Sequence, residues 1–381
     1  MIVERPALER RVLASLEAGR IPVVLGGCGT GRTSLLLRIE RLAGRDRSQY
    51  IDFAAAATTP ERCLGAIRLA SRVQPAPGGP IPPPASPRSA FEGLVAFFDS
   101  AVTPDGRPAV FLLDEALDIR TFESFPGLRH VQREIVTRLS QSPAHFVLAS
   151  RFTARTHRLL RDAPARFEVV HMPPLEVSEA VSLALQLDGG RREWAAEIAP
   201  AVAALTGGRA AYVHLLLEAL ASMGPAIDPV AALASLFAPD GRLTARCRES
   251  YEFRLHRARG YGALKAILGV LAQDEPLNLT EISHHLHRTP GSTKDYLSWL
   301  EDVDLITAQG KRYSFEAPLL RVFVRLYGRP VPPTDSDIVR EVQSFAEARL
   351  PAVPVPRGSP ALAAMERPVE VERSSGIIEI D

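Results

Sequence analysis

The feature that most constrains the fold is a glycine-rich loop between an apolar run and a helical pattern. The apolar run Ile21-Pro22-Val23-Val24-Leu25 precedes the loop, and Leu35-Leu36-Leu37-Arg38-Ile39 follows it. The loop consists of Gly26, Gly27, Cys28, Gly29, Thr30, Gly31, Arg32, Thr33 and Ser34. A buried strand that runs through glycines into a helix N-terminus lets backbone N–H groups turn inward around a polyphosphate. The spacing therefore predicts a phosphate-binding loop of the G-x-x-x-x-G-K-[ST] type.

One position departs from that motif, because Arg32 stands where the pattern has lysine. Arginine keeps the positive charge, but its planar fork replaces a compact ammonium and should hold the terminal phosphate differently. Thr33 is expected to place its hydroxyl on a magnesium ion. A merely flexible turn is the alternative. The strand before and the helix after favour phosphate binding, while Arg32 favours binding over fast hydrolysis.

Length and composition set broad limits on the class of protein. The chain has 381 residues, enough for two or three domains, with 46% hydrophobic and 23% charged residues. Lys+Arg 45 and Asp+Glu 44 leave a formal charge of +1, so any basic surface for nucleic acid must be local. We find no apolar stretch of membrane length and expect a cytoplasmic protein without a membrane partner. The three cysteines lack the spacing of a disulfide framework or a zinc site.

Strand and helix patterns alternate over the first part of the chain. Further apolar runs lie near residues 49–53, 109–113, 145–149 and 168–170, with helical patterns between them. This alternation predicts an α/β fold for residues 1–172, with a parallel sheet sandwiched by helices. The proline-rich stretch 75–87 interrupts it. We expect a surface insertion there, with a docking site for a reader of proline motifs as the less favoured alternative.

Two acids end the run at residues 109–113. In a parallel sheet the carboxyl ends of the strands face the ligand crevice, so Asp114 and Glu115 are expected beside the phosphates. Asp114 would orient magnesium through its waters, and Glu115 would polarise the attacking water. A strand followed by a solvated acidic turn is the alternative. Ser150, at the tip of the next run, is expected either to contact the terminal phosphate or to cap its strand.

The second part of the chain is predicted to be mainly helical. Residues 173–257 have helical periodicity and form an expected lid, in which Arg209 begins a helix. That arginine either swings over the nucleotide or remains a solvated surface side chain. Residues 258–328 show three helical patterns and then a hairpin, which is typical of a winged helix-turn-helix. Residues 329–381 are expected to be a tail with one helix and a proline-rich flexible linker.

The target of the winged helix remains open between duplex DNA and a protein. Candidate contacts to DNA are Ser292, Thr293 and Lys294 on the third helix and Lys311 and Arg312 at the hairpin tip. Acidic residues along and after the same helix, including Asp295 and Asp302, oppose DNA binding. Docking of a protein partner is therefore an equal alternative.

In the order of its parts, the chain resembles the AAA+ and STAND superfamily of P-loop ATPases. Within this superfamily it resembles the archaeal-type ATPases and the origin-recognition-like initiators that carry a C-terminal winged helix. The resemblance covers about residues 5–327 and rests mainly on residues 26–34 and 112–115. It implies binding of ATP or ADP with Mg²⁺ and a switch that acts on DNA, a protein partner or a second copy of itself.

The same resemblance implies roles for individual residues. Ser150 is similar to sensor 1 and Arg209 to sensor 2, while Arg161 and Arg166 stand where such proteins often carry an arginine finger for an adjacent subunit. Glu115 would support hydrolysis. Arg32 departs from the family pattern and leaves two alternatives, a non-hydrolysing nucleotide-binding scaffold and a winged-helix DNA-binding regulator.

Overall fold

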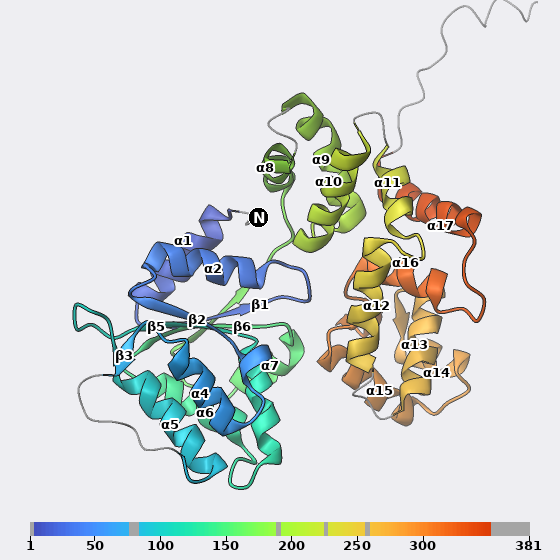
Figure 1. The fold of residues 1–381 in the computed structure, drawn as a ribbon. Coiled ribbons are helices and arrows are strands. Elements are labelled where there is room, and N and C mark those ends of the chain that lie inside the picture. The colour runs from blue at the N-terminus through green and yellow to red at the C-terminus, as the bar shows by residue number, and fades with distance from the viewer. Residues whose placement is uncertain (1–3, 76–83, 188–191, 225–227, 256–259, 352–381) are drawn as a thin grey trace, which may run out of the picture.

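The computed structural model describes residues 4–75, 84–187, 192–224, 228–255 and 260–351. They form two bodies, which the segment of residues 172–176 connects (Figure 1). The first body is built on a five-stranded sheet in the order β2-β5-β6-β1-β7. Its strands are β1 (Ile21–Leu25), β2 (Ser48–Asp52), β5 (Val110–Asp114), β6 (His145–Ser150) and β7 (Phe167–His171). All neighbouring strands are parallel. The predicted α/β core with a parallel sheet is confirmed.

Helices cover both faces of this sheet (Figure 1). One face carries α1 (Pro6–Glu17) and α2 (Arg32–Ala43), and the other carries α4 (Pro60–Leu69), α5 (Pro87–Ser100) and α6 (Val131–Gln141). Successive strand residues point to opposite faces. Accordingly, Val24 and Leu112 pack under α1 and α2, while Val23 and Leu113 join the core on the opposite face. Burial on both faces explains why the strands are continuous apolar runs rather than alternating ones.

Shorter elements complete this body. They are α3 (Phe53–Ala56), the 3-10 helix η1 (Ala116–Ser124), α7 (Thr153–Leu160) and a small antiparallel pair, β3 (Gln74–Pro75) with β4 (Ala101–Val102). The expected surface insertion at 75–87 falls mostly outside the described residues, since 76–83 are not among them.

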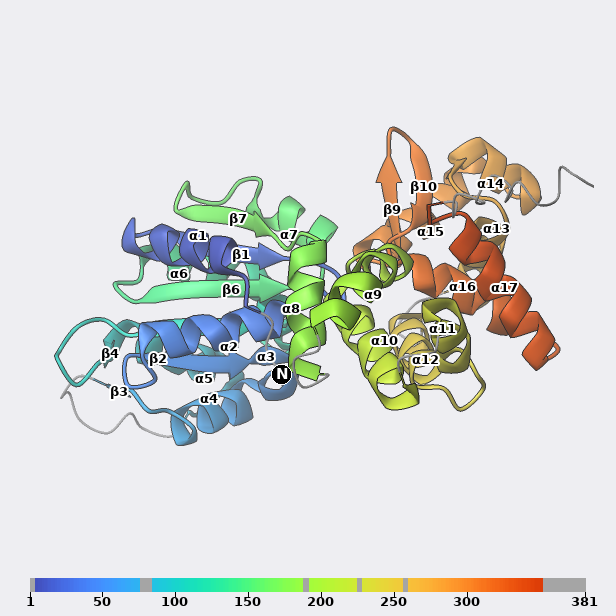
Figure 2. The same cartoon turned by 90° about the horizontal axis from the view of Figure 1, so that it is seen from above.

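The second body is mainly helical (Figure 2). Its first five helices are α8 (Val177–Leu187), α9 (Arg192–Thr206), α10 (Ala210–Met223), α11 (Pro229–Leu236) and α12 (Arg242–Leu255). They are followed by α13 (Tyr261–Gln273), α14 (Leu279–His285), α15 (Pro290–Asp302), α16 (Pro318–Tyr327) and α17 (Asp335–Glu347). Three antiparallel strands, β8 (Leu277–Asn278), β10 (Arg312–Phe315) and β9 (Ile306–Gln309), lie beside α13 to α15. The predicted three helices and hairpin are present.

One hydrophobic cluster runs through the whole second body, from Leu175 to Ala346. It is continuous because α12 packs against both α10 and α16, and α17 packs against α11 and α16. The expected lid and the module after it therefore share a core. The helix expected in the tail also belongs to this body, since its apolar face, Ile338, Val342 and Ala346, is buried.

The N-cap of α17 is Thr334, whose hydroxyl accepts a hydrogen bond from the backbone N–H of Asp337. Asp335 and Asp337 follow this cap in the first turn of the helix. The flexible linker expected after this helix lies almost wholly outside the described residues, which end at 351. Within the described part of the chain, no helix combines the length and apolar character needed to cross a membrane.

Candidate functional site

The glycine loop leaves β1 at the carboxyl edge of the sheet and turns directly into α2. Gly29 and Gly31 have φ values of +80° and +93°, a region that favours glycine. Gly31 is the N-cap of α2, and no side chain caps that helix. A Cβ on Gly26 would lie 2.7 Å from the Thr30 hydroxyl and 2.8 Å from Met172. The loop is thus tight, and its helix N-terminus has free N–H donors for an anion.

Thr33 and Asp114 meet at this edge. The Thr33 hydroxyl donates a hydrogen bond of 2.6 Å to Oδ2 of Asp114, and the Tyr50 hydroxyl donates one of 3.0 Å to the same oxygen. Burial, followed by the charge of Asp114, raises the pKa of Tyr50, which keeps it a donor. The sequence pointed to Thr33 and Asp114, but it gave no local signal for Tyr50, which comes from the neighbouring strand β2.

Arg32 and Glu115 form a buried ion pair with 2.5 Å between nitrogen and oxygen. A second guanidinium nitrogen of Arg32 donates to the Gly27 carbonyl at 2.8 Å. Glu115 has a φ of +49°, unusual for a residue with a side chain, at the junction of β5 and η1. The backbone N–H of Arg151 donates to the other carboxylate oxygen of Glu115 at 3.2 Å, and its guanidinium lies 3.4 Å from the first. Glu115 is therefore held by two arginines.

Ser150 has a structural role in this arrangement. Its hydroxyl is buried and accepts a hydrogen bond of 3.1 Å from the N–H of Phe152, at the turn into α7. The hydroxyl therefore caps the strand end, as in the alternative interpretation, and the expected contact with a terminal phosphate stays a prediction. The side chain that reaches the acidic pair from this strand tip is that of Arg151, which also pairs with Asp118 at 3.0 Å. Its position directly after the strand was the only sequence signal for it.

Arg209 connects the loop with the second body. One guanidinium nitrogen donates to the Cys28 carbonyl at 2.7 Å, and the other donates to the carbonyl and side chain of Glu316 at 3.0 and 3.3 Å. The N–H of Ala211 donates to the Gly29 carbonyl at 2.9 Å. Arg209 is therefore not a solvated surface residue. A cavity of about 270 Å³ lies between loop residues 29–34 and the start of α10, with His214 and Arg246 on its wall.

Arg254 of the second body lies beside Cys28 of the glycine loop and makes a second contact between the two bodies. Burial raises the pKa of the Cys28 thiol, but Arg254, Arg32 and Arg151 outweigh that effect, so the pKa is lowered. Arg254 donates to the carbonyl of Asp304 at 2.6 Å. Burial raises the pKa of the Asp304 carboxyl to about 7, although Arg254 opposes this shift. These long-range neighbours of the loop had no sequence signal.

The two candidate arginine fingers lie in different places. Arg166 precedes β7, at the edge of the sheet opposite the glycine loop. Its guanidinium donates to the carbonyls of Gly19, Ser140 and Ser142 at 2.8 to 3.0 Å. This corrects its expected role, because a side chain bound to three carbonyls of its own chain cannot reach another subunit. Arg161 is exposed at the C-cap of α7 and does not meet the loop of its own chain.

The expected DNA contacts are also divided. Thr293 is fully buried and donates to the Thr289 carbonyl at 3.0 Å, which rules out a contact with phosphate and corrects that prediction. The remaining four candidates are exposed: Ser292, Lys294, Lys311 and Arg312. Arg312 nevertheless donates to the Pro276 carbonyl at 2.8 Å. The C-terminal end of α15 faces the first body, where Asp302 pairs with Arg158.

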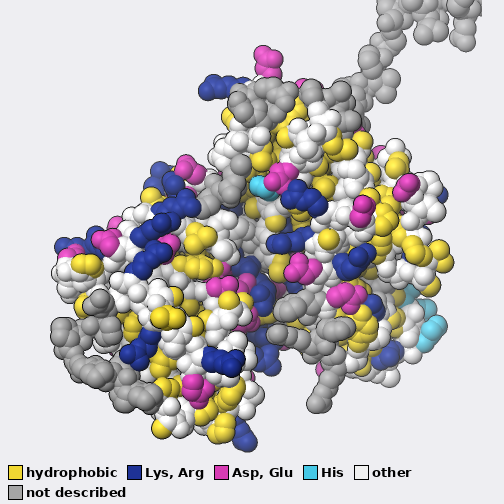
Figure 3. Space-filling model, viewed as in Figure 1, with side chains coloured by type: hydrophobic (Ala, Val, Ile, Leu, Met, Phe, Trp, Pro, Cys, Tyr) yellow, Lys and Arg dark blue, Asp and Glu magenta, His cyan; other side chains and the backbone are white. Residues whose placement is uncertain are grey.

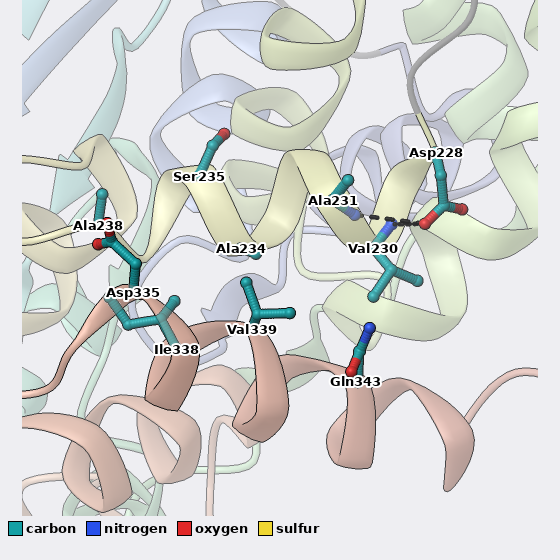
Figure 4. A pocket seen from close by; sticks show the side chains of 10 residues that line it. All are labelled: Asp228, Val230, Ala231, Ala234, Ser235, Ala238, Asp335, Ile338, Val339 and Gln343. Atoms are coloured by element: carbon teal, nitrogen blue, oxygen red, sulfur yellow. Dashed lines mark hydrogen bonds between the residues drawn. The ribbon is translucent and has the colours of Figure 1, made fainter.

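Another pocket of about 330 Å³ lies between α11 and α17 (Figure 4). Its walls are mostly apolar, with Val230 and Ala234 facing Val339. Asp228, at its rim, accepts hydrogen bonds from the N–H groups of Val230 and Ala231 and caps α11. The pocket offers mainly apolar contacts, with Asp335 and Gln343 among its lining residues.

With this geometry in hand, we compared the chain with known proteins. Its structure is similar to that of the Walker-type ATPase of Pyrococcus abyssi, with a TM-score of 0.63 and 17% identity over 85% of this chain and 96% of that one. The chain has the P-loop NTPase fold. A STAND protein with a tetratricopeptide repeat sensor from Pyrococcus horikoshii matches with a TM-score of 0.36 and 17% identity. That match covers 92% of this chain but 46% of the other, and it carries no argument. No protein-family model and no curated protein sequence matches the chain.

Proposed function

We propose that this P-loop protein is an ATP-binding molecular switch of the AAA+ and STAND type that also hydrolyses ATP. The observation that carries the proposal is the 2.6 Å hydrogen bond between Thr33, at the end of the glycine loop, and Asp114, at the end of β5. This hydrogen bond brings together a phosphate-binding loop and an acidic strand end, the two sequence segments that such enzymes need side by side. The cavity between the loop and α10 offers room for the rest of the nucleotide.

A magnesium ion fits the donors at this point. The Thr33 hydroxyl and the Asp114 carboxylate are hard oxygen donors, which Mg²⁺ prefers, and they are already adjacent. Thr33 and Asp114 would hold the ion, and its positive charge would then be available to the phosphates of ATP. Glu115 would polarise the attacking water. For this it must exchange its contacts with Arg32 and Arg151, and the phosphates of ATP supply Arg32 with a competing anion.

The second candidate function is a nucleotide-binding scaffold that does not hydrolyse ATP. The buried pair of Arg32 and Glu115 favours it, because two arginines already engage both oxygens of the carboxylate, which are then not available to water. In this version ATP or ADP controls assembly. The exposed Arg161 is then available to the nucleotide of a second copy, as the resemblance implies.

Phosphate release by the purified protein with Mg·ATP distinguishes these functions. The hydrolase proposal expects release well above that of Glu115→Gln, with or without DNA, and equal rates would remove it. Arg32→Lys then separates the two candidates. A large gain in turnover without a gain in affinity would identify the native site as one suited to holding nucleotide.

We further propose that the module of residues 258–328 is a winged helix that acts on duplex DNA or a protein. Arg209 supplies a physical route for coupling, because it touches the phosphate loop through Cys28 and the end of the hairpin segment through Glu316. Binding to duplex DNA is measured as a function of salt, with Lys311→Ala combined with Arg312→Ala against Arg133→Ala on α6 as control. Unchanged binding by the double variant would remove the role of the hairpin tip.

A further inference from the structure

The strongest unexplained feature is a cleft of about 460 Å³ between the two bodies, outside the glycine loop. Four arginines from three elements line it, namely Arg120 of η1, Arg151 and Arg155 around the start of α7, and Arg254 of α12. Phe152 and Trp299 supply aromatic surface on its two sides. Figure 3 shows basic and acidic side chains meeting along the junction between the bodies.

The positive charge of this cleft is only partly balanced. Arg151 pairs with Asp118, and Arg120 lies 3.6 Å from Glu123 near the surface. Among the described residues, no carboxylate forms an ion pair with Arg155 or Arg254. Burial and, after it, the neighbouring Arg120 lower the pKa of Arg155, whereas Asp302 and Asp118 oppose this shift without reversing it. An anion in the cleft would relieve this repulsion.

The aromatic side chains add a second recognition element. The guanidinium carbon atoms of Arg151 and Arg155 lie 4.7 and 5.0 Å from the centre of the Phe152 ring, which holds both cations in place. Trp299 belongs to α15 and is partly exposed on the facing wall. Proteins usually hold a nucleotide unit with arginines that bind its phosphate and an aromatic ring that stacks on its base. The volume lies in the range of pockets for small ligands.

We propose that this cleft is a second site, which binds one nucleotide unit with its phosphate on Arg155 and Arg254 and its base against Trp299. The unit belongs either to a free mononucleotide or to a single strand, which present the same chemistry. The site shares no lining residue with the cavity at the glycine loop, although Arg254 and Arg151 also neighbour Cys28 of that loop. The proposal does not depend on ATP hydrolysis.

The chain offers a direct reporter, because its two tryptophans are Trp194 and Trp299. In the full-length Trp194→Phe variant, excited so that tyrosine does not contribute, the tryptophan fluorescence comes from Trp299 alone. We would titrate this protein separately with thymidine monophosphate and with an oligothymidylate of about twelve nucleotides. Each titration is done with and without saturating Mg·ADP, whose own binding is measured independently. Failure of the glycine loop to bind nucleotide is thereby distinguished from failure of the cleft.

The test variant is Arg155→Gln, which leaves no described carboxylate unpaired, and the matched control is Arg133→Gln on the exposed face of α6. We expect the ligands to quench Trp299. Arg155→Gln should weaken their affinity at least about fivefold, and Arg133→Gln should leave it unchanged. Quenching by both ligands supports a nucleotide site, and quenching by the oligonucleotide alone supports a single strand as its source. The proposal is overturned if neither ligand quenches Trp299, or if Arg155→Gln and Arg133→Gln bind the ligands with equal affinity.

Discussion

A guanidinium nitrogen of Arg32 lies 2.5 Å from a carboxylate oxygen of Glu115, and both side chains are buried. The cation expected to hold the phosphates and the acid expected to polarise water thus neutralise each other. A buried charge left without its partner is costly. Binding of ATP must therefore replace the contact of Arg32 with an equivalent one to phosphate.

We predict that Glu115→Gln binds Mg·ATP more tightly while hydrolysing it more slowly. Removal of the negative charge frees Arg32 for the phosphates, which we expect to raise affinity about fivefold to tenfold, or about 1.0 to 1.4 kcal/mol. Loss of the carboxylate should lower turnover at least about a hundredfold. Equilibrium binding and phosphate release measure the two effects. Glu17→Gln, at the exposed end of α1, is the control for the charge change. Weaker binding of Mg·ATP by Glu115→Gln would show that Glu115 and the phosphates do not compete for Arg32.

Cys28 is predicted to be the most reactive thiol of the chain. Nearby arginines lower its pKa, whereas burial raises the pKa of Cys63 and of Cys247 to about 12. More thiolate is then present at Cys28 at neutral pH, so iodoacetamide should alkylate it first. Mass spectrometry of peptides measures the rates, with Cys28→Ser as the control. Mg·ATP is expected to slow the reaction by enclosing the loop, and equal labelling of all three cysteines would refute the prediction.

Gly208→Ala is predicted to destabilise the junction between the bodies. Gly208 has a φ of +63°, and a Cβ there would lie 2.7 Å from the carbonyl oxygen of Leu175. Backbone strain and this clash together should cost about 2 to 4 kcal/mol and lower the melting temperature by about 5 °C. Gly65→Ala is the matched control, because Gly65 lies within α4 with open space around it. It should be neutral or slightly stabilising.

Asp304 is predicted to make stability depend on pH. Its pKa rises from 3.8 to about 7 in the folded chain, so between these values the folded state binds more protons than the unfolded state. Its contribution is complete below the unfolded pKa and is lost as pH rises through about 7. Arg254 and Arg32 oppose the shift, whereas Glu316 adds to it, and the backbone N–H of Thr153 faces the carboxyl group.

The test of this dependence compares Asp304→Asn with the native chain in thermal melts from about pH 5 to pH 8. Asparagine mimics the protonated side chain at every pH, so the variant should gain on the native chain by about 1 to 3 kcal/mol over this interval. The gain follows from the loss in the native chain as its carboxyl ionises. A difference in melting temperature that stays constant with pH would exclude Asp304 as the titrating group.

The sequence was sufficient for the elements that local patterns encode. Five apolar runs became the five strands, and residues 26–34 became the loop and the first turn of α2. The carboxyl edge of a parallel sheet then brought Thr33 and Asp114 together as expected. By contrast, Thr293 was assigned to DNA from its residue type and its place on the third helix, and its burial within α15 removed that role.

What the sequence determined by itself was a P-loop core and the position of its acidic strand end, because strand periodicity and motif spacing are properties of neighbouring residues. Only the tertiary structure decided which partners those residues have. Tyr50, Arg151 and Arg254 reach the glycine-loop site from three separate elements. Arg166 lies at the opposite edge of the sheet, where it binds backbone carbonyl groups. Such pairings depend on packing between segments far apart in the chain, which no local pattern records.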